Sequence, residues 1–224
     1  MNLTDEQSEK FEKYYDLLID WNKKINLTSI TERGEVWVKH FEDSLSIARI
    51  IDMYSIDSVI DVGTGAGFPG IPLKLVYPHI KLTLLDSLDK RIRFLEEVIE
   101  ELSLDNVLTV HGRAEDFGRD PLYREKYDLC VSRAVASLPV LSELCIPFVR
   151  TGGSFIAYKS ERAMEELDDS NKAISLMGGM IGSTERFSLT GNDYNRTLIK
   201  IDKVEHTSDK YPRRAGVPNK KPII

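Results

Sequence analysis

The pattern of apolar and polar positions along the chain predicts a helical first part. A capping box formed by Thr4 and Gln7 starts a stretch in which apolar residues such as Phe11 and Leu18 recur at helical spacing. A second helical stretch is expected over residues 36–53. No linker rich in glycine, proline or serine follows, so we expect these helices to pack on the rest of the chain as a cap.

From residue 58 onward, short apolar runs alternate with amphipathic segments. This alternation of strands and helices indicates a parallel sheet with helices on both faces. The last two expected strands have no helix between them and should therefore be antiparallel neighbours. The expected strands cover residues 58–62, 80–85, 107–110, 127–132, 154–158, 180–187 and 197–204, and the expected helices cover residues 69–76, 88–102, 138–149 and 163–177.

Composition narrows the class of protein. The 224 residues are 42% hydrophobic and 29% charged, which is typical of a globular domain. Cys130 and Cys145 lie in apolar runs, which excludes a disulfide scaffold and a multi-cysteine zinc site, so no metal is expected. No apolar run approaches the ~18 residues of a membrane span, and the acidic N-terminus is unlike a targeting peptide. We expect a soluble cytoplasmic protein with an N-terminal helical cap (residues 1–56), an α/β domain (57–204) and a basic tail (205–224) packed on or near it.

The charge of the tail is opposite to that of the rest of the chain. The net charge is −6, which argues against broad nonspecific binding to nucleic acid, but residues 203–224 hold six Lys and Arg against two Asp and Glu. Prolines in this segment disfavour helix, so we expect an extended arm that can follow a phosphate backbone. The alternative is a solvated or packed tail with no RNA contact. The candidate RNA-binding residues are Lys210, Arg213, Arg214, Lys220 and Lys221.

A glycine-rich segment directly follows the first expected strand, with Asp61, Gly63, Gly65 and Gly67 at alternate positions. Glycines there allow a ligand to approach the backbone closely. The G-x-G-x-x-G spacing of a dinucleotide site would require glycine at the position of Phe68. An acidic residue at the strand end instead suits a cationic ligand, and S-adenosylmethionine carries a sulfonium and an ammonium group.

The next two strand ends carry chemistry that fits the same ligand. Asp86 ends the second expected strand, where an acidic side chain reads ribose hydroxyls in open α/β sheets. Ala114 and Glu115 follow the third strand and are expected to border the adenine. The alternative is a tight strand–helix turn with two incidental surface acids.

Seven segments of the chain resemble the RsmG (GidB) family of methyltransferases, which modify small-subunit ribosomal RNA. They extend over nearly the whole chain, and G-x-G-F-P-G-I-P together with S-R-A is specific to this family. The segments are WNKKINLTSI (21–30), HFEDSL (40–45), DVGTGAGFPGIPL (61–73), LLDSLDKRIRFL (84–95), RAED (113–116), SRAVASL (132–138) and YPRRAGVPNKKPI (211–223).

The resemblance implies a fold, a reaction and a set of contacts. The fold is that of a class I S-adenosylmethionine-dependent methyltransferase: a Rossmann-like seven-stranded sheet in the order 3-2-1-4-5-7-6, here with an N-terminal helical cap. The product is 7-methylguanosine in 16S ribosomal RNA, the cofactor is S-adenosylmethionine, and the partner is 16S ribosomal RNA or the small ribosomal subunit. The family's cofactor contacts correspond to Gly63, Phe68, Ala114, Glu115 and Arg133.

The residues after the fourth expected strand agree with this reaction. Enzymes that methylate exocyclic amines typically carry a D/N-P-P-Y/F-type motif there, whereas residues 132–135 read Ser-Arg-Ala-Val. Methylation of cytosine C5 needs a cysteine nucleophile, and Cys130 lies two residues too early, in an apolar run that predicts burial. Guanine N7 has a free lone pair and needs no deprotonation, so the enzyme has chiefly to align the reacting atoms and exclude water.

Two arginines, one histidine and one phenylalanine are the remaining candidate residues of the site. Arg133 is expected to hold the methionine carboxylate or guanine O6, and Arg196 to contact RNA or the guanine. His40 either lies at the site or packs between helices, and Phe68 contacts the cofactor, stacks on a base or packs in the core. The catalytic candidates are Arg133 and Arg196, and the candidate cofactor-binding residues are Asp61, Gly63, Gly65, Gly67, Phe68, Asp86, Ala114, Glu115 and Arg133.

Three other functions stay open from the residues alone. A dinucleotide oxidoreductase would have to hold phosphates in the glycine segment despite Asp61 and Phe68. A small-molecule methyltransferase would leave the basic tail and the cap without a role. A noncatalytic RNA-binding or assembly factor would keep the cofactor pocket as a relic.

Overall fold

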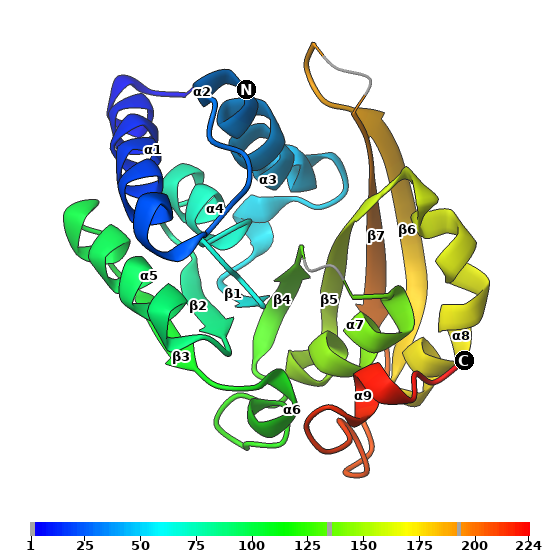
Figure 1. The fold of residues 1–224 in the computed structure, drawn as a ribbon. Coiled ribbons are helices and arrows are strands. Elements are labelled where there is room, and N and C mark those ends of the chain that lie inside the picture. The colour runs from blue at the N-terminus through cyan, green and yellow to red at the C-terminus, as the bar shows by residue number, and fades with distance from the viewer. Residues whose placement is uncertain (1–2, 134–135, 192–193) are drawn as a thin grey trace.

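The computed structural model describes residues 3–133, 136–191 and 194–224. Within them seven strands form one sheet in the order β3-β2-β1-β4-β5-β7-β6, which confirms the predicted order (Figure 1). Neighbours among β1 to β5 pair parallel, and β7 pairs antiparallel with β5 and β6, as expected. The strands are β1 Ser58–Val62, β2 Lys81–Asp86, β3 Val107–His111, β4 Tyr127–Ser132, β5 Val149–Ser160, β6 Gly179–Ser188 and β7 Asn195–Lys203.

Helices lie on both sides of this sheet (Figure 1). None of those in the described ranges is long and apolar enough to cross a membrane. The helices are α1 Asp5–Ile25, α2 Arg33–Val36, α3 Asp43–Leu45, α4 Gly70–Val76, α5 Asp89–Glu101, α6 Ala114–Phe117, α7 Leu138–Cys145, α8 Leu167–Leu176 and α9 Val217–Lys220.

The alternation of side chains along the strands builds two hydrophobic cores. Val59 and Leu129 face one side of the sheet, where they join a core with residues of α1, α4 and α5. Ile60 and Cys130 face the other side, in a core with residues of α7 and α8. Cys130 is fully buried, which confirms the prediction that it is a packing residue.

The helical cap is only partly as predicted. The Thr4–Gln7 capping box at the start of α1 is confirmed. The helical stretch expected over residues 36–53 is confirmed as far as Arg49, but it is not a regular α-helix, because α2 leads into a wide π-helical turn at Trp37–Glu42, followed by α3 and a 3-10 turn at Ser46–Arg49. The backbone N–H of Asp43 donates to the carbonyls of residues 38 and 40, and this frees the carbonyl of Lys39 for another partner.

The predicted end of the helix after residue 138 is also wrong. The helix α7 stops at Cys145, and Pro147 lies in a 3-10 turn that joins it to β5. Gly152 and Gly153 therefore belong to β5 and do not terminate a helix. A Cβ at Gly153 would lie 2.5 Å from the carbonyl oxygen of Asp128 on the neighbouring strand, so glycine allows the two strands to approach.

The last segment, residues 207–221, folds back on the domain, and we call it the C-terminal strap. Arg124 donates to the carbonyls of Thr207 (2.6 Å) and Tyr211 (2.8 Å). The guanidinium of Arg213 donates to both carboxylate oxygens of Glu143, which is 1% exposed. The strap ends in the one-turn helix α9, so the expectation of a wholly extended arm is wrong.

We predict that Arg213→Ala destabilises the protein, because it leaves the buried Glu143 carboxylate without its cation. Loss of one partner of a buried pair costs about 3–5 kcal/mol, and partial exposure of Arg213 puts the expected loss near the lower value. Urea denaturation measures it. The neighbouring Arg214→Ala, at an exposed side chain, is the matched control. Equal unfolding free energies for the two variants would contradict the structural role of the ion pair.

Candidate active site

The glycine segment forms a loop between β1 and α4, and Asp61 lies beneath it. The Asp61 carboxylate accepts hydrogen bonds from the Thr64 hydroxyl (2.7 Å) and the Gly70 backbone N–H (2.9 Å). Burial raises the pKa of Asp61 to about 7, and its Oδ1 has no partner among the described residues. Asp61 therefore ties the loop together, and this position does not support its predicted contact with the cofactor.

Two cavities meet at the loop, and Gly63 lines both. One has a volume of about 160 Å³ and the other about 510 Å³. Gly65, which lines the larger cavity, has a φ of 63°, and a Cβ built there would meet none of the described atoms within 4 Å. A Cβ at Gly67 would lie 2.7 Å from both Ile71 and Tyr14. Gly65 thus leaves open space that fits a bound cofactor, whereas Gly67 is required for packing.

The ends of β1, β2 and β3, which the sequence predicted to form the cofactor site, meet at the smaller cavity. Asp86, at the end of β2, accepts from the backbone N–H groups of Gly65 (2.9 Å) and Leu88 (3.0 Å) and lines the cavity. Ala114 and Glu115, after β3, line the same cavity. This juxtaposition agrees with the predicted ribose and adenine contacts, which stay predictions in the absence of a ligand.

The larger cavity holds a cluster of two arginines around one buried carboxylate. Arg133, which follows β4, donates to Asp43 (2.9 Å) and to the freed carbonyl of Lys39 (3.0 Å). Arg196, on β7, donates to both oxygens of the same carboxylate, at 2.7 and 3.1 Å. Asp43 is 2% exposed. The structure thus brings both predicted catalytic arginines together, through an aspartate that the sequence analysis did not select.

His40 and Phe68 both pack together and line the larger cavity. Their rings stack with centroids 4.5 Å apart, and the Arg133 guanidinium lies 5.0 Å from the Phe68 centroid. The His40 ring nitrogens lie 3.1 Å from the Arg133 guanidinium and 2.9 Å from the Thr28 hydroxyl. Burial, reinforced by the neighbouring Arg133 charge, lowers the pKa of His40 to about 3. His40 is therefore neutral at pH 7.

A tyrosine that the sequence analysis missed supports the loop from the cap. The hydroxyl of Tyr14 on α1 donates a hydrogen bond to the carbonyl of Ala66. Its ring packs on Phe41 and Phe68, and the residue is fully buried. Its position three residues after Phe11 and four before Leu18 was the available signal for a core position, but nothing in the pattern marked the hydroxyl as a ligand of the loop.

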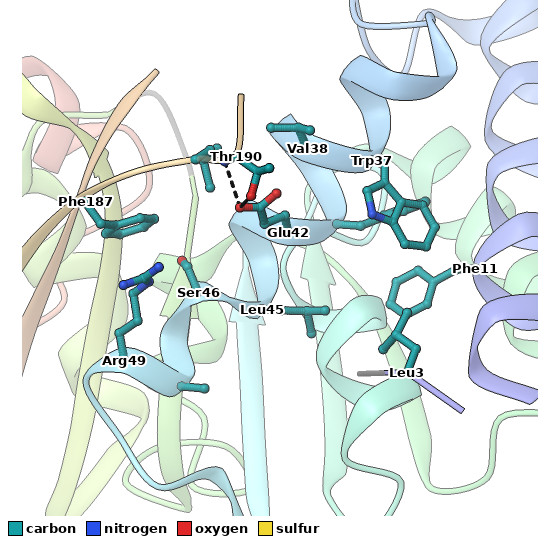
Figure 2. A pocket seen from close by; sticks show the side chains of 13 residues that line it. Leu3, Phe11, Trp37, Val38, Glu42, Leu45, Ser46, Arg49, Phe187 and Thr190 are labelled. Atoms are coloured by element: carbon teal, nitrogen blue, oxygen red, sulfur yellow. Dashed lines mark hydrogen bonds between the residues drawn. The ribbon is translucent and has the colours of Figure 1, made fainter. Parts of the chain in front are cut away.

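A separate cavity of about 590 Å³ lies beside the cap and is lined by none of the glycine-loop residues (Figure 2). Trp37 and Phe187 contribute rings to it, and Arg49 packs over Phe187 at 4.9 Å. Glu42 accepts hydrogen bonds from the backbone N–H and hydroxyl of Thr190 (Figure 2). This contact joins the helical turn that carries His40 to the segment after β6.

The predicted RNA-binding residues divide into two groups. Arg213 of the strap pairs with Glu143 of α7 and is only partly exposed, so its position gives less support to the predicted RNA contact. The other four, Lys210, Arg214, Lys220 and Lys221, are exposed, and none forms an ion pair with a carboxylate in the described part of the chain. No group of three or more His, Cys, Asp or Glu side chains within that part is arranged to hold a metal ion.

We predict that Tyr14→Phe weakens binding of S-adenosylmethionine about two- to tenfold, because the loop loses a hydrogen bond worth ~0.5–1.5 kcal/mol. Isothermal titration calorimetry measures the affinity. Tyr15→Phe is the control, since the Tyr15 hydroxyl donates to the carbonyl of Thr31, outside the loop. The prediction fails if both variants bind with the wild-type dissociation constant.

We also predict that His40 lowers stability as the pH falls from about 6.5 toward 3. The folded-state pKa of about 3 lies below the unfolded value of about 6.5, so only the unfolded chain gains a proton in that range. Between pH 7 and pH 5 this costs about 2 kcal/mol of unfolding free energy. Urea denaturation should show that loss in the wild type but not in His40→Gln, with the exposed His79→Gln as control. Parallel pH profiles for wild type and His40→Gln would refute it.

Comparison with known proteins agrees with this site. The family model of rRNA small subunit methyltransferase G matches residues 7–193. Proteins named ribosomal RNA small subunit methyltransferase G from Acetivibrio thermocellus and Bacillus subtilis are 53% and 48% identical to this chain. Both alignments span 100% of this chain and 91% and 93% of the respective relatives.

Solved structures with low sequence identity share the fold. The crystal structure of M. jannaschii TYW2 in complex with AdoMet has a TM-score of 0.56 at 17% identity, over 74% of this chain and 76% of that one. The crystal structure of a mutant of MtNAS has a TM-score of 0.57 at 16% identity, over 89% and 76%. The family match and the full-length relatives confirm the predicted resemblance: this chain belongs to the rRNA small subunit methyltransferase G family.

Proposed function

We propose that this protein transfers a methyl group from S-adenosylmethionine to N7 of a guanine in 16S ribosomal RNA. Family membership and the two cavities at the glycine loop support the proposal. When bound, S-adenosylmethionine supplies a methyl carbon made electrophilic by the adjacent sulfonium. The substrate places the reaction in the cytoplasm, where ribosomal RNA is made.

The choice of N7 as the methylated atom rests on the hydrogen bonds of the groups that line the larger of the two cavities at the glycine loop, the one of about 510 Å³. Both oxygens of Asp43 accept hydrogen bonds from arginine, and the neutral His40 ring has partners at both nitrogens. Among the described residues around this cavity, no carboxylate or imidazole is left to remove a proton from a substrate. Guanine N7 needs no such base, because its lone pair is free to attack the methyl carbon.

The arginine pair supplies positive charge with a fixed orientation. Arg133 and Arg196 together carry +2 against the single −1 of Asp43, so with His40 neutral the cluster has a net charge of +1. A guanidinium has five N–H donors, and the contacts with Asp43 leave others available. We assign Arg133 to the methionine carboxylate or guanine O6, and Arg196 to the guanine or an RNA phosphate.

Four exposed basic residues of the strap support an RNA substrate over a small molecule. Lys220 and Lys221 follow directly on Asn219, which lines the smaller cavity, so this basic part of the strap lies beside the proposed cofactor site. We retain Lys210, Arg214, Lys220 and Lys221 as RNA-binding residues and withdraw Arg213. The family match removes the dinucleotide oxidoreductase alternative.

Nucleoside mass spectrometry tests the reaction. Purified protein, S-adenosylmethionine and small subunits from a strain lacking this enzyme should yield 7-methylguanosine in the 16S RNA. Arg196→Gln should lower kcat/KM about 10- to 100-fold, as expected for loss of a charged hydrogen bond of ~1.5–3 kcal/mol. Arg186→Gln, at an exposed arginine of β6, is the matched control. Absence of 7-methylguanosine with active cofactor binding would favour the noncatalytic alternative.

A further inference from the structure

The C-terminal strap reaches the smaller cavity at the cofactor site. The backbone N–H of Gly216 donates to the Glu115 carboxylate at 2.8 Å. Three residues further on, Asn219 lines the cavity together with Asp86 and Ala114. A segment from the end of the chain thus contributes to a cavity that is otherwise lined by residues at the strand ends and in α6 and α7. The helix α9 of this segment lies beside α7 (Figure 1).

The position of Asn219 is fixed by the folded domain. In addition to the Arg124 and Arg213 contacts, Arg119 donates to the carbonyl of Pro212 at 2.6 Å. Pro218, next to Asn219, is buried, and α9 packs against α7. These contacts hold the backbone of α9 beside the cavity, so this segment has little conformational freedom to lose when a ligand binds, while the Asn219 side chain itself is exposed.

The walls of the cavity suit a flat, partly polar ring. Ala136, Leu141 and Leu144 provide apolar surface, and Glu115 and Asn219 provide polar atoms. One oxygen of Glu115 is already occupied by the strap. The Asn219 carboxamide, by contrast, has no hydrogen-bond partner among the residues that the structure describes.

We propose that the C-terminal strap completes the adenine end of the cofactor site and that Asn219 recognises the adenine edge through its carboxamide. The inference rests on the proposed use of S-adenosylmethionine. A carboxamide offers one acceptor and one donor side by side, and this matches the amine and N7 of adenine. Hypoxanthine presents two acceptors, O6 and N7, at this edge and does not match it. Glu115 acts as a positioning residue, because it holds Gly216 and therefore α9.

The test compares two ligands that differ only at this edge. S-adenosylhomocysteine and its deaminated counterpart, S-inosylhomocysteine, are titrated calorimetrically into wild type, Asn219→Ala and the control Asp209→Ala, at an exposed strap residue. We expect Asn219→Ala to bind S-adenosylhomocysteine about fivefold or more weakly and S-inosylhomocysteine within twofold of wild type. The preference for adenine should therefore shrink in Asn219→Ala and persist in Asp209→Ala.

The other possible results distinguish failure of this inference from failure of the proposed function. An unchanged preference for adenine in Asn219→Ala, whether both affinities fall together or neither changes, overturns the inference. If the alanine variant fails to fold, Asn219→Leu provides the test, because it keeps a side chain of similar size and removes both the donor and the acceptor, and an unchanged preference there overturns the inference equally. Failure of the wild type to bind S-adenosylhomocysteine at all would instead contradict the proposed function.

Discussion

The buried carboxylate of Asp43 is the interaction on which the site depends. It lies on the helical cap, yet its two partners come from the end of β4 and from β7. A buried carboxylate is costly unless it is paired and hydrogen-bonded, and here both oxygens receive guanidinium N–H groups. One ion triad thus holds three distant parts of the chain, and displacement of Asp43 would leave two guanidinium groups without their carboxylate.

Segments near both ends of the chain, the cap and the strap, form hydrogen bonds with residues of the site. From the cap, Tyr14 holds the loop carbonyl of Ala66, and from the strap, Gly216 binds Glu115 in the smaller cavity. The sheet itself supplies the strand ends and the glycine loop, a framework shared with structures of very different sequence. The features that distinguish this site therefore lie in the segments before β1 and after β7, which pack on that shared framework.

Features encoded by local pattern could be predicted from the sequence, whereas features set by distant partners could not. The strands β1 and β4 and the Thr4–Gln7 capping box follow from neighbouring residues alone. The wide turn at Trp37–Glu42 accompanies a Lys39 carbonyl that bonds Arg133, 94 residues away, and no local pattern reports this. Arg213 looked like a free cation for the same reason, since Glu143 lies 70 residues earlier in the chain.

Individual site residues show the same division. The open space at Gly65 agrees with its predicted contact with a ligand, which stays a prediction, and the signal was available because a glycine motif after a strand encodes a local turn. Asp43 was missed although it stands in the quoted segment HFEDSL, three residues after His40. That spacing places both side chains on one face of a helix, and this was the signal available. Its meaning required the positions of Arg133 and Arg196, which only the folded sheet provides.

Among the described residues, the carboxylate and the imidazole that line the larger cavity are both engaged, and this also limits the chemistry of the site. A general base needs a free lone pair and a pKa near the working pH, and His40 has neither because both nitrogens are engaged and burial keeps its pKa near 3. Asp43 is committed to two arginines. Such a site can orient a nucleophile and stabilise negative charge, but it cannot deprotonate one. The reaction is thereby restricted to substrates whose attacking atom already carries an available lone pair, and guanine N7 is such an atom.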